Sequence, residues 1–239
     1  MLRFIRTSAL ALVALLLVAG PALAYSVSPL RTVLRPTGPG ATDRVTISNT
    51  EAAPITLTVT AYEVTIAEDG AMTTAPTQDL VVFPPQAIVQ PGAEQALQLR
   101  YVGPADKAPT LYDVFIEQLP IQAVGGDQAA IKVALDFHLG VVMEPEQARP
   151  GLTAGAPRRA DDGTRWLFEV TNAGDGFARL NRGTWTGRVA GEAVPLSAED
   201  LVIEGTSYIA PGTTRTVAIA ADRVAPDAAL SSVGFEPDA

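Results

Sequence analysis

The strongest constraint on the fold of this chain is a strict alternation of apolar residues over residues 131–143. Every odd position is apolar, from Ile131 through Leu135 and Leu139 to Met143, and the positions between are mostly polar or small. Because successive side chains of a strand point to opposite faces, the pattern predicts one long strand with a single apolar face. Two interpretations stay open: the strand covers the core of its own sheet, or it outruns that sheet and offers its apolar row to another protein.

Shorter strand patterns recur before and after this segment, with Gly, Pro, Asn and Asp between them and no sustained helical period. The expected strands are 44–48, 55–64, 80–83, 96–101, 111–119 and, further on, 165–172, 183–189, 201–208 and 215–219. This spacing favours an all-β protein built from antiparallel sandwiches. Residues 144–151, with two prolines and a glycine, predict a semi-rigid elbow between a domain of residues 25–145 and a second of residues 146–239.

The N-terminus has the pattern of a secretory leader. Arg3 and Arg6 precede an apolar run over residues 9–19, and Ala22-Leu-Ala24 supplies the small residues of a cleavage site. We therefore expect residues 1–24 to be a signal peptide cleaved after Ala24. No later segment is long and apolar enough for a membrane helix, so we expect export without membrane insertion.

Charge and composition exclude several classes of function. Loss of the two leader arginines changes the formal net charge from -9 to -11, which argues against a nucleic-acid partner. The chain has no cysteine, which excludes disulfides and thiolate sites, and His138 is its only histidine. The acidic pairs Asp161-Asp162 and Glu199-Asp200 lack calcium-loop spacing. We expect no catalytic residues, no metal, no cofactor and no enzymatic activity.

Several local patterns, in order along the chain, carry a family resemblance. They lie at residues 26–34, 45–49, 83–86, 89–100 and 111–120, and include a Pro-Pro turn, a Pro-Gly turn and a strand ending in proline. Over about residues 25–145 the chain resembles the periplasmic chaperones of the chaperone–usher pathway, the PapD-like family of pilus and fimbrial assembly. The second half matches only loosely, through Val170-Thr-Asn172 and Ala210-Pro-Gly212.

The resemblance implies both a fold and a function. The expected fold is all-β, with two immunoglobulin-like antiparallel β-sandwich domains in an L-shaped arrangement. The expected function is that of a periplasmic chaperone, which stabilises pilin or fimbrial subunits by donor-strand complementation and delivers them to an outer-membrane usher. The alternative is a secreted β-sandwich protein with a structural or adhesive role, whose long strand serves its own domain.

Residue roles are also implied by the resemblance. The expected donor side chains are Ile131, Val133, Leu135, Phe137 and Leu139. Arg31 matches the arginine that binds the terminal carboxylate of the subunit. The lysine that usually accompanies this arginine is replaced by Gly140, so Arg31 acts alone or with His138 or Arg100. This departure indicates a divergent branch of the family. We also expect the free protein to protect the apolar row by self-association or by reordering of residues 121–130.

Overall fold

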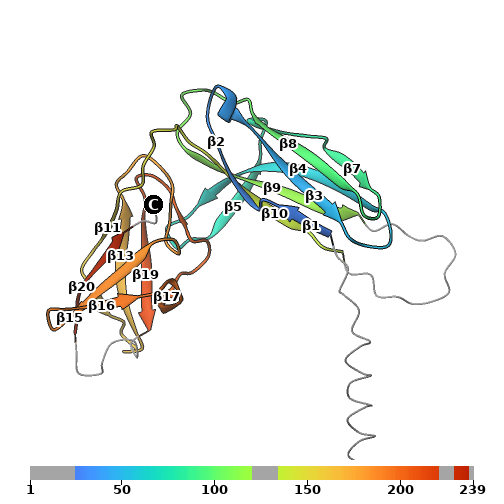
Figure 1. Ribbon diagram of the computed structural model, residues 1–239. Coiled ribbons are helices and arrows are strands. Elements are labelled where there is room, and N and C mark those ends of the chain that lie inside the picture. Colours follow the sequence, from blue (N-terminus) through green and yellow to red (C-terminus); the bar gives the residue numbers. More distant parts are fainter. Residues whose placement is uncertain (1–24, 120–133, 221–228, 237–239) are drawn as a thin grey trace, which may run out of the picture.

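The computed structural model describes residues 25–119, 134–220 and 229–236, which form two β-sandwich domains set at an angle to each other (Figure 1). The all-β prediction and the L-shaped arrangement are confirmed. In the described ranges the helical turns are limited to η1 (Pro39–Ala41) and η2 (Ala198–Asp200). The same ranges contain no helix with the length and apolar character that crossing a membrane requires.

The N-terminal domain has two sheets. The first has the order β1 (Tyr25–Ser28), β3 (Thr42–Asn49), β8 (Glu94–Tyr101), β6 (Leu80–Phe83). The second has the order β2 (Arg31–Leu34), β10 (Phe137–Met143), β9 (Thr110–Leu119), β4 (Ile55–Ile66), β5 (Met72–Pro76), and β7 (Gln86–Val89) also pairs with β4. Strands pair antiparallel except β2 and β10, which run parallel.

Residues 26–34, the first segment that carries the family resemblance, are divided between the two sheets. β1 pairs with β3, whereas β2 pairs with β10, and the cis peptide bond between Ser28 and Pro29 lies between them. A proline has no N–H to donate, which is consistent with the ladder ending there. The chain therefore crosses from one sheet to the other and brings Arg31 beside β10.

The N-terminal core fills the space between these sheets. Alternating residues of β3 and β8, including Ile47 and Leu99, are fully buried there. Leu139, Val141 and Met143 of β10 join the same core and are also fully buried. For this half of the alternating segment, the strand covers the core of its own domain.

The prediction of one continuous strand over residues 131–143 is only partly correct. β10 begins at Phe137, residues 134–136 have no strand pairing, and residues 131–133 lie outside the described residues. Side chains take the place of the ladder at this point: the Gln118 side chain accepts from the Leu135 N–H at 3.1 Å, and Asp136 accepts from the Gln118 N–H at 3.1 Å. Alternation of apolar residues identifies a face but not the residue at which pairing begins.

The C-terminal domain is built from shorter strands. One sheet has the order β11 (Leu152–Ala154), β13 (Arg165–Asn172), β19 (Thr214–Ala220), β17 (Leu201–Val202), with β12 (Arg158–Arg159) beside β13. The others are β14 (Ala178–Arg179) with β18 (Tyr208–Ile209), and β16 (Glu192–Leu196), β15 (Thr184–Val189), β20 (Leu230–Glu236). Phe168, Trp185 and Leu180 lie in its core.

The predicted strand over residues 201–208 is wrong. β17 and β18 lie in different sheets, and the residues between them form a loop that passes the N-terminal domain. Gly205 in this loop has a φ of +66° and lies so close to Gly70 that a Cβ would collide with the Gly70 carbonyl oxygen. The loop therefore depends on a left-handed glycine and on a contact with the other domain, neither of which apolar alternation reveals.

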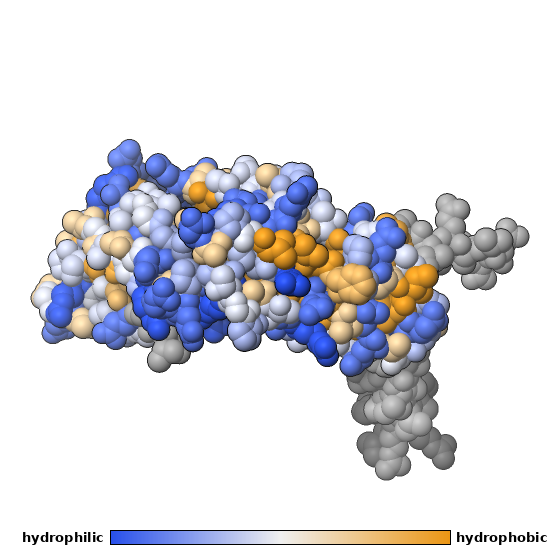
Figure 2. All heavy atoms as spheres, turned by 90° about the horizontal axis from the view of Figure 1, so that it is seen from above, coloured by the Kyte–Doolittle hydropathy of each residue, from blue (hydrophilic) through white to orange (hydrophobic). Residues whose placement is uncertain are grey.

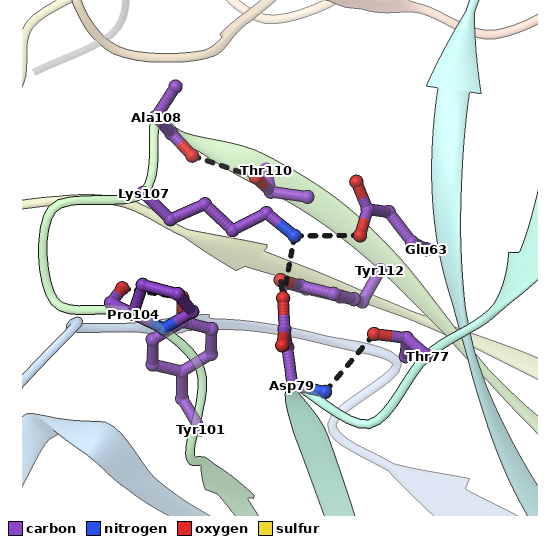
Figure 3. Close-up of polar contacts among 9 residues, drawn as sticks. All are labelled: Glu63, Thr77, Asp79, Tyr101, Pro104, Lys107, Ala108, Thr110 and Tyr112. Atoms are coloured by element: carbon purple, nitrogen blue, oxygen red, sulfur yellow. Dashed lines mark hydrogen bonds and ion pairs between the residues drawn. The ribbon is translucent and has the colours of Figure 1, made fainter.

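A polar cluster ties together the two sheets of the N-terminal domain (Figure 3). Lys107 lies between Glu63 on β4 and Asp79 just before β6, with Nζ–oxygen distances of 2.7 and 2.6 Å. Burial lowers the pKa of Lys107, but hydrogen bonds to Asp79 and Glu63 outweigh this and raise it above its usual value. The hydroxyl of buried Tyr112 donates to Asp79 at 3.4 Å. Because its members come from both sheets, the cluster braces this end of the sandwich.

Candidate functional site

A cleft of about 330 Å³ lies where the two domains meet. Arg31 of β2, Val142 of β10 and Glu144 line it from the N-terminal side. From the C-terminal side it is lined by Phe177, Arg179 and Tyr208.

An apolar cluster beside the cleft joins the two domains and shares Val142, Phe177 and Tyr208 with the cleft lining. Val64, Leu111 and Val142 are buried on the outer face of the β4–β9–β10 sheet, and Phe177 and Tyr208 pack against them. The rings of Phe177 and Tyr208 meet edge to face, with centroids 6.3 Å apart. Alternation along β10 explains the contact, because its odd positions enter the N-terminal core and its even positions lie on the outer face, where Val142 meets the second domain.

Strand register places Arg31 directly beside Gly140, and Gly140 lies opposite Asp113 on β9. A Cβ added to Gly140 would lie 3.6 Å from the Tyr208 hydroxyl and 3.9 Å from Cγ of Arg31. Burial raises the pKa of Tyr208, and the charge of Arg31 opposes that shift. Arg31, Gly140 and Tyr208 therefore form one corner of the cleft.

Polar contacts hold the two domains in this arrangement. The Thr206 N–H donates to the Gly70 carbonyl at 3.0 Å, and the Glu144 carboxylate accepts from the Phe177 N–H at 3.0 Å. Buried Arg215 donates to the carbonyls of residues 204, 206 and 208, and burial lowers its pKa. Arg215 thus stiffens the loop that carries Tyr208 into the cleft.

The other two cations predicted to accompany Arg31 lie elsewhere. Arg100 is exposed on β8, in the sheet that does not contain Arg31. His138 lies on the same face as Gly140, but its Nδ1 is 2.7 Å from the Asp113 carboxylate and its ring stacks on Phe115 at 4.9 Å between centroids. Neither residue lines the cleft beside Arg31.

The predicted donor side chains lie in three different environments. Leu139 is fully buried in the core of its own domain, so it is not available to a partner and is removed from the proposed row. Phe137 is half-buried, with its ring 4.9 Å from that of Tyr25. Leu135 is 36% exposed, and its carbonyl accepts from the Tyr25 hydroxyl. Ile131 and Val133 lie outside the described residues.

Sequence reasoning missed Arg179 and Tyr208, the polar residues that the second domain contributes to the cleft. The structure buries Ala178 and Leu180 in the C-terminal core, so alternation puts Phe177 and Arg179 on the opposite face. What the sequence does not show is that this face meets Arg31, because that depends on how the domains pack.

Comparison with solved structures shows the same fold. The chaperone CfaA of class 5 fimbriae is 12% identical with a TM-score of 0.59, over 90% of this chain and 92% of that one. The CsuC–CsuE chaperone–subunit complex from Csu pili of Acinetobacter baumannii matches at 14% identity and TM-score 0.57, over 89% and 92%. The E. coli chaperone DraB matches at 14% and 0.51, over 82% and 86%.

Sequence comparison assigns the family. No curated protein gives a significant match. The family described as pili and flagellar-assembly chaperone, PapD N-terminal domain, matches residues 26–149, which is more than half of the chain. The matched segment contains β2 to β10 and all of β1 except Tyr25, and with them Arg31 and Gly140. The chain therefore belongs to the PapD-like family of pilus-assembly chaperones.

Proposed function

We propose that this protein binds pilus subunits in the periplasm by donating the segment before and within β10 as a strand, and that it passes them to an outer-membrane usher. Family membership supports a chaperone role over the alternative of a structural or adhesive protein. In this proposal residues 1–24 are a leader cleaved after Ala24. Sequencing the N-terminus of the exported protein should therefore begin at Tyr25.

The observation that carries the proposal is an open strand edge beside a cation. β9 pairs with the whole of β10, whereas β2 covers only residues 140–143 on the other side. In the part of the chain that the structure describes, residues 137–139 have no strand partner on that side. An unpaired edge is a template for the strand of another chain.

Arg31 supports one direction for the added strand. A partner strand on the open edge would lie in line with β2, so one of its ends would meet Arg31 beside Gly140. If that end is the carboxyl terminus, the added strand runs parallel to β10. A bidentate arginine is well suited to a carboxylate, and the pairing would set the register of the two strands.

The distribution of apolar surface supports a partner on the N-terminal domain. Among the described residues, the large apolar side chains that are exposed lie on that domain, apart from Val202. Figure 2 shows the larger orange areas over the N-terminal domain, at the right of the view. Exposed apolar surface on a soluble protein commonly marks an interaction site. In this proposal the free protein covers part of that surface by self-association, which sedimentation at several concentrations would measure.

The test is a pair of charged substitutions in the proposed row. Val133→Asp with Leu135→Asp should abolish capture of a pilin-like subunit identified by mass spectrometry in co-expression, because a buried unpaired carboxylate costs several kcal/mol. The variant should still fold, since Leu135 is 36% exposed and does not belong to the N-terminal core cluster. Val202→Asp, at an exposed valine of the other domain, is the matched control.

Leu139 separates the two roles of the segment. Leu139→Ala should lower the free energy of unfolding by about 3 kcal/mol, because it empties a fully buried site. Leu135→Ala should instead weaken capture and leave thermal unfolding nearly unchanged. Capture of a subunit by the folded double aspartate variant, at the level of the parent protein, would reject the donor-strand proposal.

A further inference from the structure

The C-terminal domain brings a second arginine into the cleft. Arg179 lies on β14, which pairs with β18 so that Arg179 is opposite Tyr208. Their neighbours Ala178 and Ile209 are buried in the C-terminal core, so Arg179 and Tyr208 lie on the other face. Both line the same 330 Å³ cleft as Arg31. The cleft therefore carries one cation from each domain.

Both guanidinium groups lack a polar partner among the residues that the structure describes. Within the described ranges 25–119, 134–220 and 229–236, neither Arg31 nor Arg179 forms a hydrogen bond or ion pair through its side chain. Nε of Arg179 is buried with no hydrogen-bond partner among these residues. The guanidinium carbon of Arg179 lies 5.6 Å from the centroid of the Tyr208 ring, which orients the group without using its N–H donors. A buried donor without an acceptor is costly, and the Arg179 guanidinium in the cleft lining is therefore suited to bind an anion that enters beside exposed Arg31.

The charge balance of the cleft favours such an anion. Its lining contains two arginines and one carboxylate, that of Glu144. One oxygen of Glu144 already accepts from the Phe177 N–H at 3.0 Å. The Tyr208 hydroxyl, close to Arg31 and to Gly140, offers a further donor. The carboxylate of a bound ligand would therefore meet hydrogen-bond donors from both domains.

We infer that Arg179 acts with Arg31 and the Tyr208 hydroxyl to bind the terminal carboxylate of the partner chain, so that the anion site is completed only by the C-terminal domain. The inference rests on the proposed function, because it takes the partner to be a subunit whose strand ends at the cleft. It assigns the second cation to Arg179, in place of Arg31 acting alone or with His138 or Arg100. The C-terminal domain then takes part in binding directly.

The first experiment measures the affinity of the full mature chain for the subunit identified in co-expression. Arg179→Gln keeps most of the aliphatic stem and removes the charge, and it should weaken binding about 10- to 100-fold, the range for a hydrogen bond to a charged group. Arg179→Lys should restore part of that loss. Arg188→Gln, at an exposed arginine of the same domain, is the control and should bind like the parent.

A modified subunit separates carboxylate binding from a structural role of Arg179. Extending the subunit by two glycines moves its carboxylate out of the cleft, and Arg179→Gln should then cause no additional loss. Equal losses with the native and the extended subunit would overturn the inference, because they would show that Arg179 only supports domain packing. Parental affinity in Arg179→Gln, with a clear loss in Arg31→Ala, would overturn it while leaving the proposed function intact.

A second experiment needs no subunit. Acetate, a minimal carboxylate, is titrated into the ¹⁵N-labelled mature chain, and the Nε–Hε signals of Arg31 and Arg179 are followed. Both signals should shift with the same saturation curve, and the Arg179 shift should disappear in Arg31→Ala. An Arg179 signal that does not respond to acetate would overturn the inference even if the protein captures pilus subunits.

Discussion

Asn49 in the N-terminal domain and Asn172 in the C-terminal domain occupy equivalent positions, each at the end of a central strand and each almost completely buried. Each side-chain amide donates to two backbone carbonyls, at 2.9 and 2.9 Å for Asn49 and at 2.8 and 3.3 Å for Asn172. Each side-chain oxygen accepts from a backbone N–H two residues further on, at 2.9 and 3.1 Å. The two domains therefore close the same turn with the same side chain.

A Pro-Gly turn completes the correspondence. Gly92 and Gly212 each donate their N–H to the carbonyl of the respective asparagine at 2.8 Å. Their φ angles are +70° and +72°, values that glycine adopts without strain. Both domains thus use an asparagine and a left-handed glycine to join neighbouring strands of a sandwich.

The two domains differ outside this shared turn of asparagine and glycine. The N-terminal domain has the Lys107 cluster, the half-open β10 and most of the exposed apolar side chains. The C-terminal domain has both tryptophans and, among its described residues, one ion pair, the exposed Arg165–Glu204 contact at 4.0 Å. The same turn therefore occurs in both sandwiches, whereas the ion pairs, the open strand edge and the exposed apolar side chains differ between the domains.

The largest expected effect on the free energy of unfolding comes from replacing the buried asparagine in one domain at a time. Asn172→Ala should lower the free energy of unfolding of the C-terminal domain by about 3 kcal/mol, because several buried backbone groups lose their partner. Trp166 and Trp185 both lie in that domain, so tryptophan fluorescence during urea denaturation reports on it. Asn49→Ala should leave the fluorescence transition of the C-terminal domain unchanged. It should instead lower the urea concentration at which circular dichroism detects unfolding of the N-terminal domain. If Asn49→Ala moves the fluorescence transition equally, the domains unfold as one unit.

Removing the ion-pair cluster tests a stabilising element of the N-terminal domain. Lys107→Met should lower its free energy of unfolding by about 1.5 kcal/mol, since two carboxylates 2.7 and 2.6 Å from Nζ lose their shared partner. Adding Glu63→Gln should recover part of the loss by removing one of the two unpaired charges. Circular dichroism during urea denaturation gives the measurement. Stability equal to that of the parent would mean that the apolar core alone holds this end together.

The glycine turns provide a matched pair of smaller effects. Gly92→Ala and Gly212→Ala should each cost about 1 kcal/mol, because an alanine is disfavoured at a φ near +70°. A Cβ at either position meets no atom within 4 Å, so the cost comes from the backbone alone. The same denaturation experiments measure both variants. A clear difference between the two would show that the turns are not equivalent.

The smallest effect is expected at Gly140 of β10, which lies beside Arg31 and close to Tyr208 of the other domain. Gly140→Lys should leave the free energy of unfolding within about 0.5 kcal/mol of the parent, because the added Cβ would make ordinary contacts with Tyr208 and Arg31 at 3.6 and 3.9 Å. Its ammonium would add a cation beside Arg31, so subunit binding should tighten or stay the same. Calorimetric titration with the subunit checks this. Weaker binding would indicate that the Tyr208 hydroxyl already occupies the space that the lysine needs.

Several elements could be predicted from the sequence because their cause is local. Alternating apolar residues identified β3, β4, β8, β9, β13 and β19, and the Pro-Gly pattern before β8 indicated a turn. A strand that is buried on one face has apolar residues at every second position, so its sequence shows the alternation directly. The resemblance added Arg31 and the place of Gly140. The start of β10 and the break between β17 and β18 could not be predicted, because each depends on contacts with distant residues.

The sequence by itself determined the all-β class, the succession of strands and the family, because apolar alternation, turn residues and short motifs need no knowledge of distant contacts. Only the tertiary structure decided that Leu139 belongs to the core while Leu135 is exposed, and that Arg179 and Tyr208 join Arg31. The physical reason is the same in both cases. Which neighbour covers a strand face is set by domain packing and sheet register, and these bring together residues that are far apart in the chain.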